Sequence, residues 1–217
     1  MLVDYFKRVG SRRFIIMLIG NVFLGIGVSI FKLSGWGNDP FSGMIMALSD
    51  QFGISYGDFL IMFNIPLFMI EFFFGKKFIG IGTIVNMFFV GYLATFFYNI
   101  WMNMIGSPEV TWQKLVVVCL GVIVCSFGVS LYQTPNVGVA PYDSISLILK
   151  KHFPKIPYFW LRMSNDAFCA VVCYLTGGIV GLGTLVSAFG LGPIIHLFNV
   201  NFTEKLLRKT NDIKVKL

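Results

Sequence analysis

Two short segments with a shared pattern hold the side chains best suited to binding a small molecule. Residues 35–43 (GWGNDPFSG) and 136–144 (NVGVAPYDS) both contain G-x-x-P-[FY]-[SD]. Proline favours the first position of a helix, so each segment should begin one. Exposed N–H groups there bind anionic or zwitterionic groups, whereas the aspartates favour a cation, an amine or a proton. The candidate binding residues are Asp39, Pro40, Phe41, Pro141, Tyr142 and Asp143.

The two aspartates also have a simpler interpretation, which the sequence leaves open. Asp39 precedes a proline at the N-cap position, and Asp143 lies in the first turn of its helix. Carboxylates at these positions cap free N–H groups and meet the positive end of the helix dipole. The matching placement of the two segments favours a binding site, because paired broken elements mark such sites in transporters.

Polar side chains inside apolar segments form a second group of candidates, because they are costly in a bilayer. Arg162 and Asp166 are four residues apart and share a helix face, which favours an ion pair. Asn64 and Asn165 either join helices by hydrogen bonds or contribute to the same binding site. We include all four among the candidate site residues.

Signatures of catalysis and of metal binding are absent from the sequence. It contains no HExxH, G-x-S-x-G or P-loop motif, and only two histidines. The four cysteines lie in apolar runs and form no CxxC pair. We therefore expect no enzymatic activity, no cofactor and no metal.

The composition places the candidate residues in a membrane protein. Of the 217 residues, 56% are hydrophobic and 12% are charged, and the mean hydropathy is +0.79. Soluble domains carry about 25% charged residues. These values exclude a disordered chain, a nucleic-acid-binding module and an ordinary cytosolic enzyme. The expected partners are the lipid bilayer and a small solute, without nucleic acid, and the oligomeric state stays open.

Six apolar segments are long enough to cross about 30 Å of hydrocarbon. Two further segments, 40–52 and 141–152, have a helical pattern but are short and polar, so they either re-enter the membrane or lie at its surface. The expected fold is all-α. The expected spans are residues 14–33, 58–74, 78–100, 115–133, 157–176 and 179–199.

Basic residues orient these spans, because they collect on the cytoplasmic side. With a cytoplasmic N-terminus and six crossings, all 17 basic residues except Lys32 and Lys114 lie at or near the inner face. Both termini are then cytoplasmic. In this arrangement Lys76 or Lys77 should neutralise Glu71.

An internal repeat appears when the chain is shifted by 101 residues. Gly27, Gly37, Pro40, Asn64 and Gly80 then meet identical residues at 128, 138, 141, 165 and 181. Each half holds three expected spans, so the second half must enter from the opposite side, as in many transporters. The expected parts are a cytoplasmic basic N-terminus (1–13), a first three-helix repeat (14–100), an external linker (101–113), an inverted three-helix repeat (114–199) and a cytoplasmic basic tail (200–217).

The two Gly-Pro segments, together with GIGTIVN (80–86) and GLGTLVS (181–187), resemble the YczE/YyaS/YitT type of small bacterial membrane protein, most closely the YczE branch. The resemblance covers about residues 10–205. It implies a bacterial inner-membrane protein and transfers no activity or catalytic residue.

The function that we expect is that of a small transporter or permease for a small polar solute, with a site between the repeats. The alternative is a membrane accessory or scaffold protein without transport. A water-accessible cavity lined by residues 36–42, 137–143, 64 and 165 would favour transport, and a dry, fully packed bundle would favour the scaffold.

Overall fold

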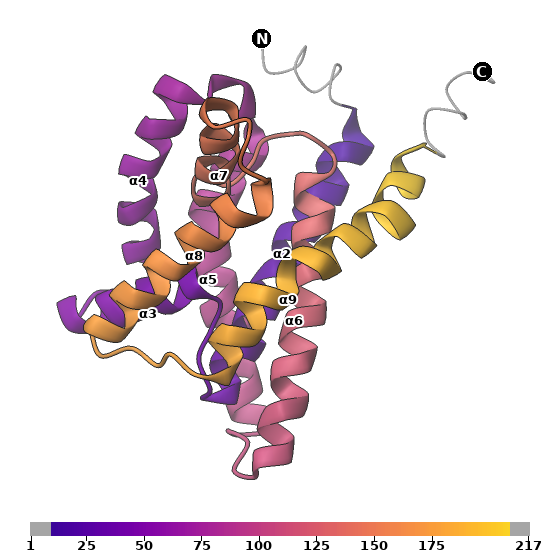
Figure 1. Ribbon diagram of the computed structural model, residues 1–217. Coiled ribbons are helices and arrows are strands. Elements are labelled where there is room, and N and C mark those ends of the chain that lie inside the picture. The colour runs from indigo at the N-terminus through magenta and orange to yellow at the C-terminus, as the bar shows by residue number, and fades with distance from the viewer. Residues whose placement is uncertain (1–9, 209–217) are drawn as a thin grey trace.

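The computed structural model describes residues 10–208, and all of its regular elements there are helical (Figure 1). The long helices are α2 (Ser11–Ser34), α4 (Tyr56–Phe74), α5 (Ile81–Met104), α6 (Thr111–Gln133), α8 (Tyr158–Leu175) and α9 (Leu182–Phe198). The short elements are α3 (Pro40–Phe52), α7 (Pro141–His152), the 3-10 turn η1 (Lys76–Phe78) and the π-helical turn η2 (Asn199–Thr203). The prediction of an all-α fold is confirmed. The basic residues Lys7, Arg8, Lys209, Lys214 and Lys216, which helped to orient the chain, lie outside the described residues.

Within residues 10–208, five helical runs are long and apolar enough to cross a membrane: α2, α4, α5, α6 and Leu182–Arg208. The predicted span 157–176 does form a helix, α8, of 18 residues, but α8 is not among these five. Arg162, Asn165 and Asp166 all lie on α8 and lower its hydropathy. The chain is therefore a multi-pass membrane protein, and the count of six spans stays a prediction.

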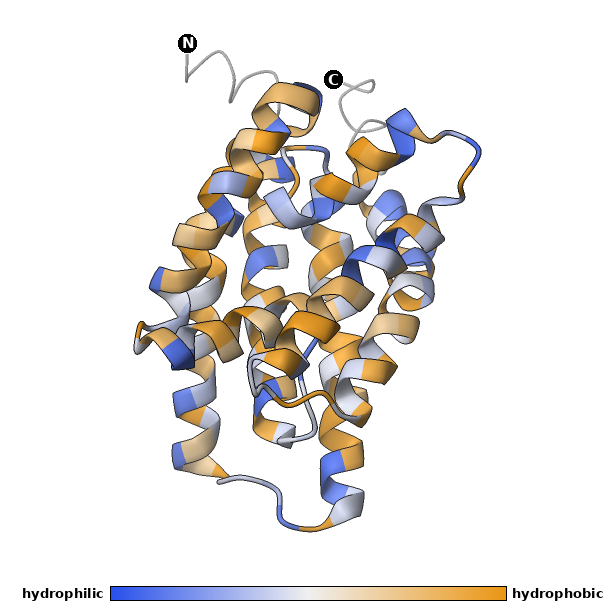
Figure 2. Cartoon of the chain, turned by 60° about the vertical axis from the view of Figure 1, so that its left-hand side comes forward, coloured by the Kyte–Doolittle hydropathy of each residue, from blue (hydrophilic) through white to orange (hydrophobic). Residues whose placement is uncertain are grey.

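Large apolar side chains cover the outside of the bundle. Phe73, Phe89 and Leu175 are 67%, 57% and 75% exposed. Figure 2 shows hydrophobic residues on the outer faces of the helices over most of their length. Water would not favour so large an apolar surface, whereas hydrocarbon solvates it without cost.

Helices α2 and α6 form the central pair of the bundle and run in opposite directions (Figure 1). Glycines allow their backbones to approach closely, as is common between helices in a bilayer. A Cβ atom on Gly27 would lie 2.6 Å from the Cys125 backbone, and one on Gly128 would overlap the Leu24 backbone. The two Gly-Pro segments follow the C-terminal ends of α2 and α6, so the close packing of this pair sets the positions from which both segments start.

The short helices α3 and α7 begin at the predicted prolines, Pro40 and Pro141. Asp39 is the N-cap of α3, where its carboxylate accepts a hydrogen bond from the Ser42 N–H at 3.1 Å. Asp143 lies in the first turn of α7. Both positions match the expectation from the sequence.

Each Gly-Pro segment contacts the Gly-x-Gly-Thr string of the other half of the chain. The Gly82 N–H donates to the Val137 carbonyl, and the Gly183 N–H donates to the Trp36 carbonyl, both at 2.9 Å. The two donors are 101 residues apart, and so are the two acceptors. The central glycine of each segment has a positive φ, +96° and +123°, which permits these close turns. The halves therefore hold one another's segments in place.

Candidate functional site

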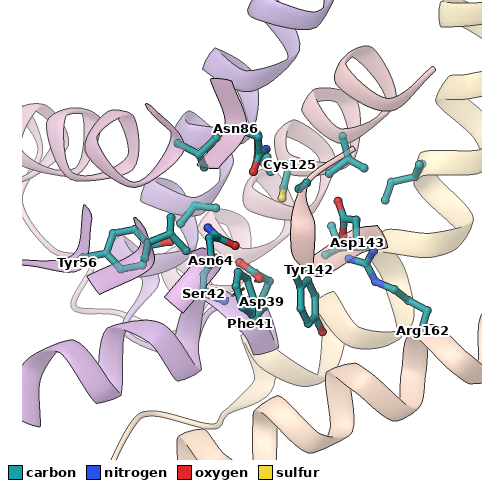
Figure 3. Close-up of a pocket in the computed structure, with 18 residues that line it drawn as sticks. Asp39, Phe41, Ser42, Tyr56, Asn64, Asn86, Cys125, Tyr142, Asp143 and Arg162 are labelled. Carbon is teal, nitrogen blue, oxygen red and sulfur yellow. Dashed lines mark hydrogen bonds and ion pairs between the residues drawn. The ribbon is translucent and has the colours of Figure 1, made fainter. Parts of the chain in front are cut away.

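A cavity of about 70 Å³, lined by both polar and apolar side chains, lies where the N-terminal turns of α3 and α7 meet (Figure 3). A buried water needs about 10–15 Å³ of such space, so the cavity has room for a few waters or one small ion. Apolar residues of α2, α5, α6 and α9 complete the wall. The polar side chains that line it include Asp39, Ser42, Asn64, Asn86, Asp143 and Arg162.

Phe41 and Tyr142 join the two short helices at this cavity. Their rings stack with centroids 4.1 Å apart and planes 9° apart. The two residues occupy matching positions, 101 residues apart. Stacking between the second residues of α3 and α7 therefore brings two helix N-termini to one place.

Asp39 presents a free carboxylate oxygen at the cavity. Its Oδ1 atom caps α3, but its Oδ2 atom is buried and has no hydrogen-bond partner among the described residues. The Asp39 N–H donates to Asn38 Oδ1 at 2.8 Å, and Asn38 Nδ2 donates to the Val28 carbonyl at 3.2 Å. These bonds fix the turn. One carboxylate oxygen thus stays available for a ligand.

Asp143, in contrast, has partners on both carboxylate oxygens. Arg162 Nη1 lies 2.5 Å from Oδ1. Oδ2 accepts hydrogen bonds from the Tyr132 hydroxyl and from Gln133 Nε2, the latter at 2.8 Å. A second carboxylate, Asp166, lies 3.6 Å from Arg162 Nε, as the four-residue spacing predicted. Arg162 therefore links α7 to α8 and carries no unpaired charge.

Asp166 does not line the central cavity. Its Oδ1 accepts a hydrogen bond from the Tyr142 hydroxyl at 2.5 Å. A separate cavity of about 370 Å³ is lined by both Asp166 and Arg162, together with His196. Arg162 lines this second cavity as well as the central one. Val129, Leu191 and Ile195 also line both cavities, so Arg162 is the charged member of a shared wall.

The comparisons with known proteins agree with this architecture. Residues 11–200 match the family described as "Family of unknown function (DUF6198)". The chain belongs to the DUF6198 family. It is 26% identical to the uncharacterized membrane protein YczE of Bacillus subtilis, over 82% of this chain and 80% of YczE. It is 23% identical to the uncharacterized protein YyaS of the same organism, over 83% of this chain and 89% of YyaS.

A third relative in the comparison is an uncharacterized protein of Haemophilus influenzae, 26% identical over 84% of this chain and 81% of its own length. No solved structure matches the chain. The resemblance to YczE and YyaS, which the motifs predicted, is confirmed. The similarity to YczE, named as a membrane protein, agrees with the apolar helices.

The two repeat-related asparagines have different surroundings. Asn64 is buried on α4 and lines the cavity, and its side chain makes no hydrogen bond within residues 10–208. Asn165 does not line the cavity, because its Nδ2 donates to Ser146 Oγ on α7 at 2.9 Å. The position that matches Ser146 in the first half is Ile45, which offers no acceptor. This difference frees Asn64 for a ligand and leaves Asn165 to join two helices.

Several polar residues of the site are not among the candidates from the sequence, and they include Ser42 and Tyr56 in the cavity wall. Tyr132 and Gln133 end α6 and hold Asp143. Asn86 on α5 lines the cavity, and its Nδ2 donates to Asn21 Oδ1 at 2.9 Å. A signal was present, since Tyr132 and Gln133 interrupt an apolar span just before a Gly-Pro segment, and Asn86 interrupts another.

Glu71 lacks the partner that the sequence suggested. The Lys76 ammonium lies 4.9 Å from the Phe72 ring centroid, and the Lys77 ammonium lies 4.8 Å from that of Phe78. Neither lysine pairs with Glu71. Attraction to exposed aromatic faces keeps both ammonium groups at the surface, where water also solvates them. The expected neutralisation of Glu71 by these lysines is wrong.

Proposed function

We propose that this protein is a small transporter or permease of the bacterial cytoplasmic membrane, and that its solute is a small cation. The observation that carries the proposal is the polar cavity between α3 and α7, into which Asp39 presents an unpartnered carboxylate oxygen. A scaffold would gain nothing from an unpaired buried polar group, which costs about 1–3 kcal/mol. The proposal assigns transport to this site, and no catalysis.

An inverted repeat of three plus three spans is part of this proposal. The helices α3 and α7 begin 101 residues apart, at Pro40 and Pro141, and α5 and α9 begin 101 residues apart, at Ile81 and Leu182. The reciprocal hydrogen bonds between the halves support the same relation. With α8 as the sixth span and both termini in the cytoplasm, the cavity lies between the repeats, where transporters of this architecture bind substrate.

The balance of charge around the cavity favours a cation. Asp39 and Asp143 line the cavity, and Asp166, outside it, pairs with Arg162; the three carboxylates contribute −3 when ionised, and Arg162 contributes +1. The N-termini of α3 and α7 add about +0.5 each. The sum is about −1, and Asp39 is the carboxylate whose charge is not met by Arg162. A small cation bound at Asp39 would neutralise this net charge.

Two larger cavities flank the central one and support a path through the bundle. One, of about 540 Å³, is lined by Lys32, Asn38 and Gly43. The other is the cavity beyond Arg162, of about 370 Å³. The first shares no lining residue with the central cavity but includes Asn38, whose Oδ1 accepts a hydrogen bond from the Asp39 N–H. The second shares four lining residues with the central cavity, Val129, Arg162, Leu191 and Ile195. The solute would therefore pass Asp39 on one side and Arg162 on the other.

The experiment is flux of guanidinium into proteoliposomes, because guanidinium is small and stays charged at neutral pH. Wild-type protein should raise the guanidinium flux above that of empty liposomes. Asp39→Asn should reduce the flux of the wild-type protein at least about tenfold, because loss of a charge contact costs about 1.5 kcal/mol or more. The matched control is Asp58→Asn. Asp58 also lies in the first turn of a helix, accepts a hydrogen bond from Ser55, and lines none of the three cavities. Equal fluxes for both variants would contradict the proposal.

A further inference from the structure

Glu71 is a completely buried carboxyl group in the last turns of α4. Its exposure is 0%, and neither of its side-chain oxygens has a hydrogen-bond partner among the described residues. It lies beside α7, close to Ser144 and within electrostatic range of Asp143. The Ser144 hydroxyl donates to the Pro141 carbonyl at 2.8 Å, within its own helix. Glu71 therefore stands apart from the Asp143–Arg162 cluster but next to it.

The described elements packed against α4 bring no cation to Glu71, and Lys151 of α7 is exposed at the surface. The Lys76 and Lys77 ammonium groups of η1 lie on aromatic rings, as described above. On α7, the Lys150 ammonium donates to the Pro154 and Ile156 carbonyls, and His152 Nδ1 bonds to the Ile148 carbonyl at 2.9 Å.

The remaining neighbours of α4 also lack a positive charge for Glu71. Helix α5 has no acidic or basic residue. Of its two tyrosines, Tyr92 binds Asp58 at the other end of α4, and the Tyr98 ring contacts the Lys32 ammonium. The acid of α3, Asp50, is exposed and lies at that other end too. The charged group of α7 nearest to the middle of the bundle, Asp143, is negative.

Asp39 accepts a backbone N–H at the positive N-terminal end of α3, whereas Glu71 lies near the negative C-terminal end of α4 and accepts no hydrogen bond from the described residues. An ionised carboxylate at Glu71 would be buried without a counter-charge, which costs far more than binding a proton. We propose that Glu71 is a proton-binding site, occupied in this conformation, and that its proton is the coupling ion of transport; the second part rests on the proposed function. The proton comes from water on one side of the membrane and returns to water on the other, and no bond other than the carboxyl O–H forms or breaks.

The link to the solute site is Asp143. Loss of the proton would place the negative charge of Glu71 next to that of Asp143. The single positive charge of Arg162 would then face three carboxylates, Glu71, Asp143 and Asp166. Arg162 is the charged residue among the four that line both the central cavity and the cavity beyond it, so movement of its side chain would change access to the central one. Protonation of Glu71 and the position of Arg162 are thereby coupled.

Infrared spectroscopy tests the proton site without reference to transport. At neutral pH, the difference spectrum between wild type and Glu71→Gln should contain the C=O stretch of a protonated carboxylic acid. The control is Glu109→Gln, since Glu109 is exposed in a loop and should give carboxylate bands alone. Glu71→Asp, which keeps a carboxyl group, should shift the acid band. Gln is nearly isosteric and neutral, so Glu71→Gln should melt at the same temperature as wild type or higher. A carboxylate band in place of the acid band would overturn the proton site.

The coupling role is tested in proteoliposomes that contain a pH-sensitive dye. Guanidinium moving down its gradient should carry protons across the membrane in wild type and in Glu109→Gln. In Glu71→Gln the proton movement should be lost. Undiminished proton movement in Glu71→Gln would overturn the coupling role. Absence of guanidinium movement in wild type would contradict both the proposed function and the coupling role, while the infrared spectrum still decides on the proton site.

Discussion

Removal of the charge on Asp143 should destabilise the protein far more than removal of the charge on Asp39. Asp143 is buried and bonds to Arg162 at 2.5 Å, and to Tyr132 and Gln133. Breaking a buried ion pair by removal of one partner costs about 3–5 kcal/mol. Arg162 would keep Asp166 at 3.6 Å, so the loss should be smaller, about 2–3 kcal/mol. Asp39→Asn keeps the cap of α3 and should cost only about 0–1 kcal/mol.

A double-mutant cycle isolates the pair. The free energy of unfolding would be measured by reversible denaturation in mixed micelles for Asp143→Asn, Arg162→Met and the double variant. We expect the double variant to be more stable than the sum of the single losses indicates, by about 1–3 kcal/mol, as is typical of residues in contact. Additive losses, together with a cost below about 1 kcal/mol for Asp143→Asn, would refute the reasoning that Arg162 is held by Asp143.

Three further predictions follow from the packing, the stacked rings and the charge pattern. Gly27→Ala should cost at least about 1–3 kcal/mol, because its Cβ meets the Cys125 backbone, whereas Gly192→Ala, with no atom within 4 Å of the new Cβ, should leave the melting temperature nearly unchanged. Tyr142→Phe keeps the ring stack but removes the hydrogen bond to Asp166, so it should lower stability by about 0.5–1.5 kcal/mol, and an unchanged melting temperature would speak against that bond. Single cysteines at residues 77 and 152 should resist an impermeant reagent in intact cells while those at 35 and 107 react, and the reverse pattern would invert the proposed topology.

The local structure of the site could be predicted from the sequence, because it depends on neighbouring residues. A proline preceded by an aspartate was sufficient to predict the start of α3 and its N-cap. The spacing of Arg162 and Asp166 was sufficient to predict their pairing along one helix. The bounds of both short helices were predicted within a residue for the same reason.

Contacts between helices could not be predicted in the same way, because they depend on how the bundle closes. Nothing in the spacing of Asp143 and Arg162 requires a bond between them, and their bond depends on how α7 and α8 fold back on one another. Glu71 was paired with the lysines nearest in sequence, yet its side chain faces α7. Asn64 and Asn165 were treated alike because the repeat relates them, but Ser146 satisfies only Asn165. Residues at matching positions in the proposed repeat thus meet different partners.

Calorimetric titration of guanidinium into purified protein tests most directly the claim that Asp39 binds the solute. We predict a measurable heat of binding for wild type. The affinity of Asp39→Asn should be lower by about 10- to 150-fold, the equivalent of about 1.5–3 kcal/mol. The affinity of Asp58→Asn should equal that of wild type. Equal binding by wild type and Asp39→Asn, with both proteins folded, would contradict the assignment of this carboxylate and of the cavity that it faces.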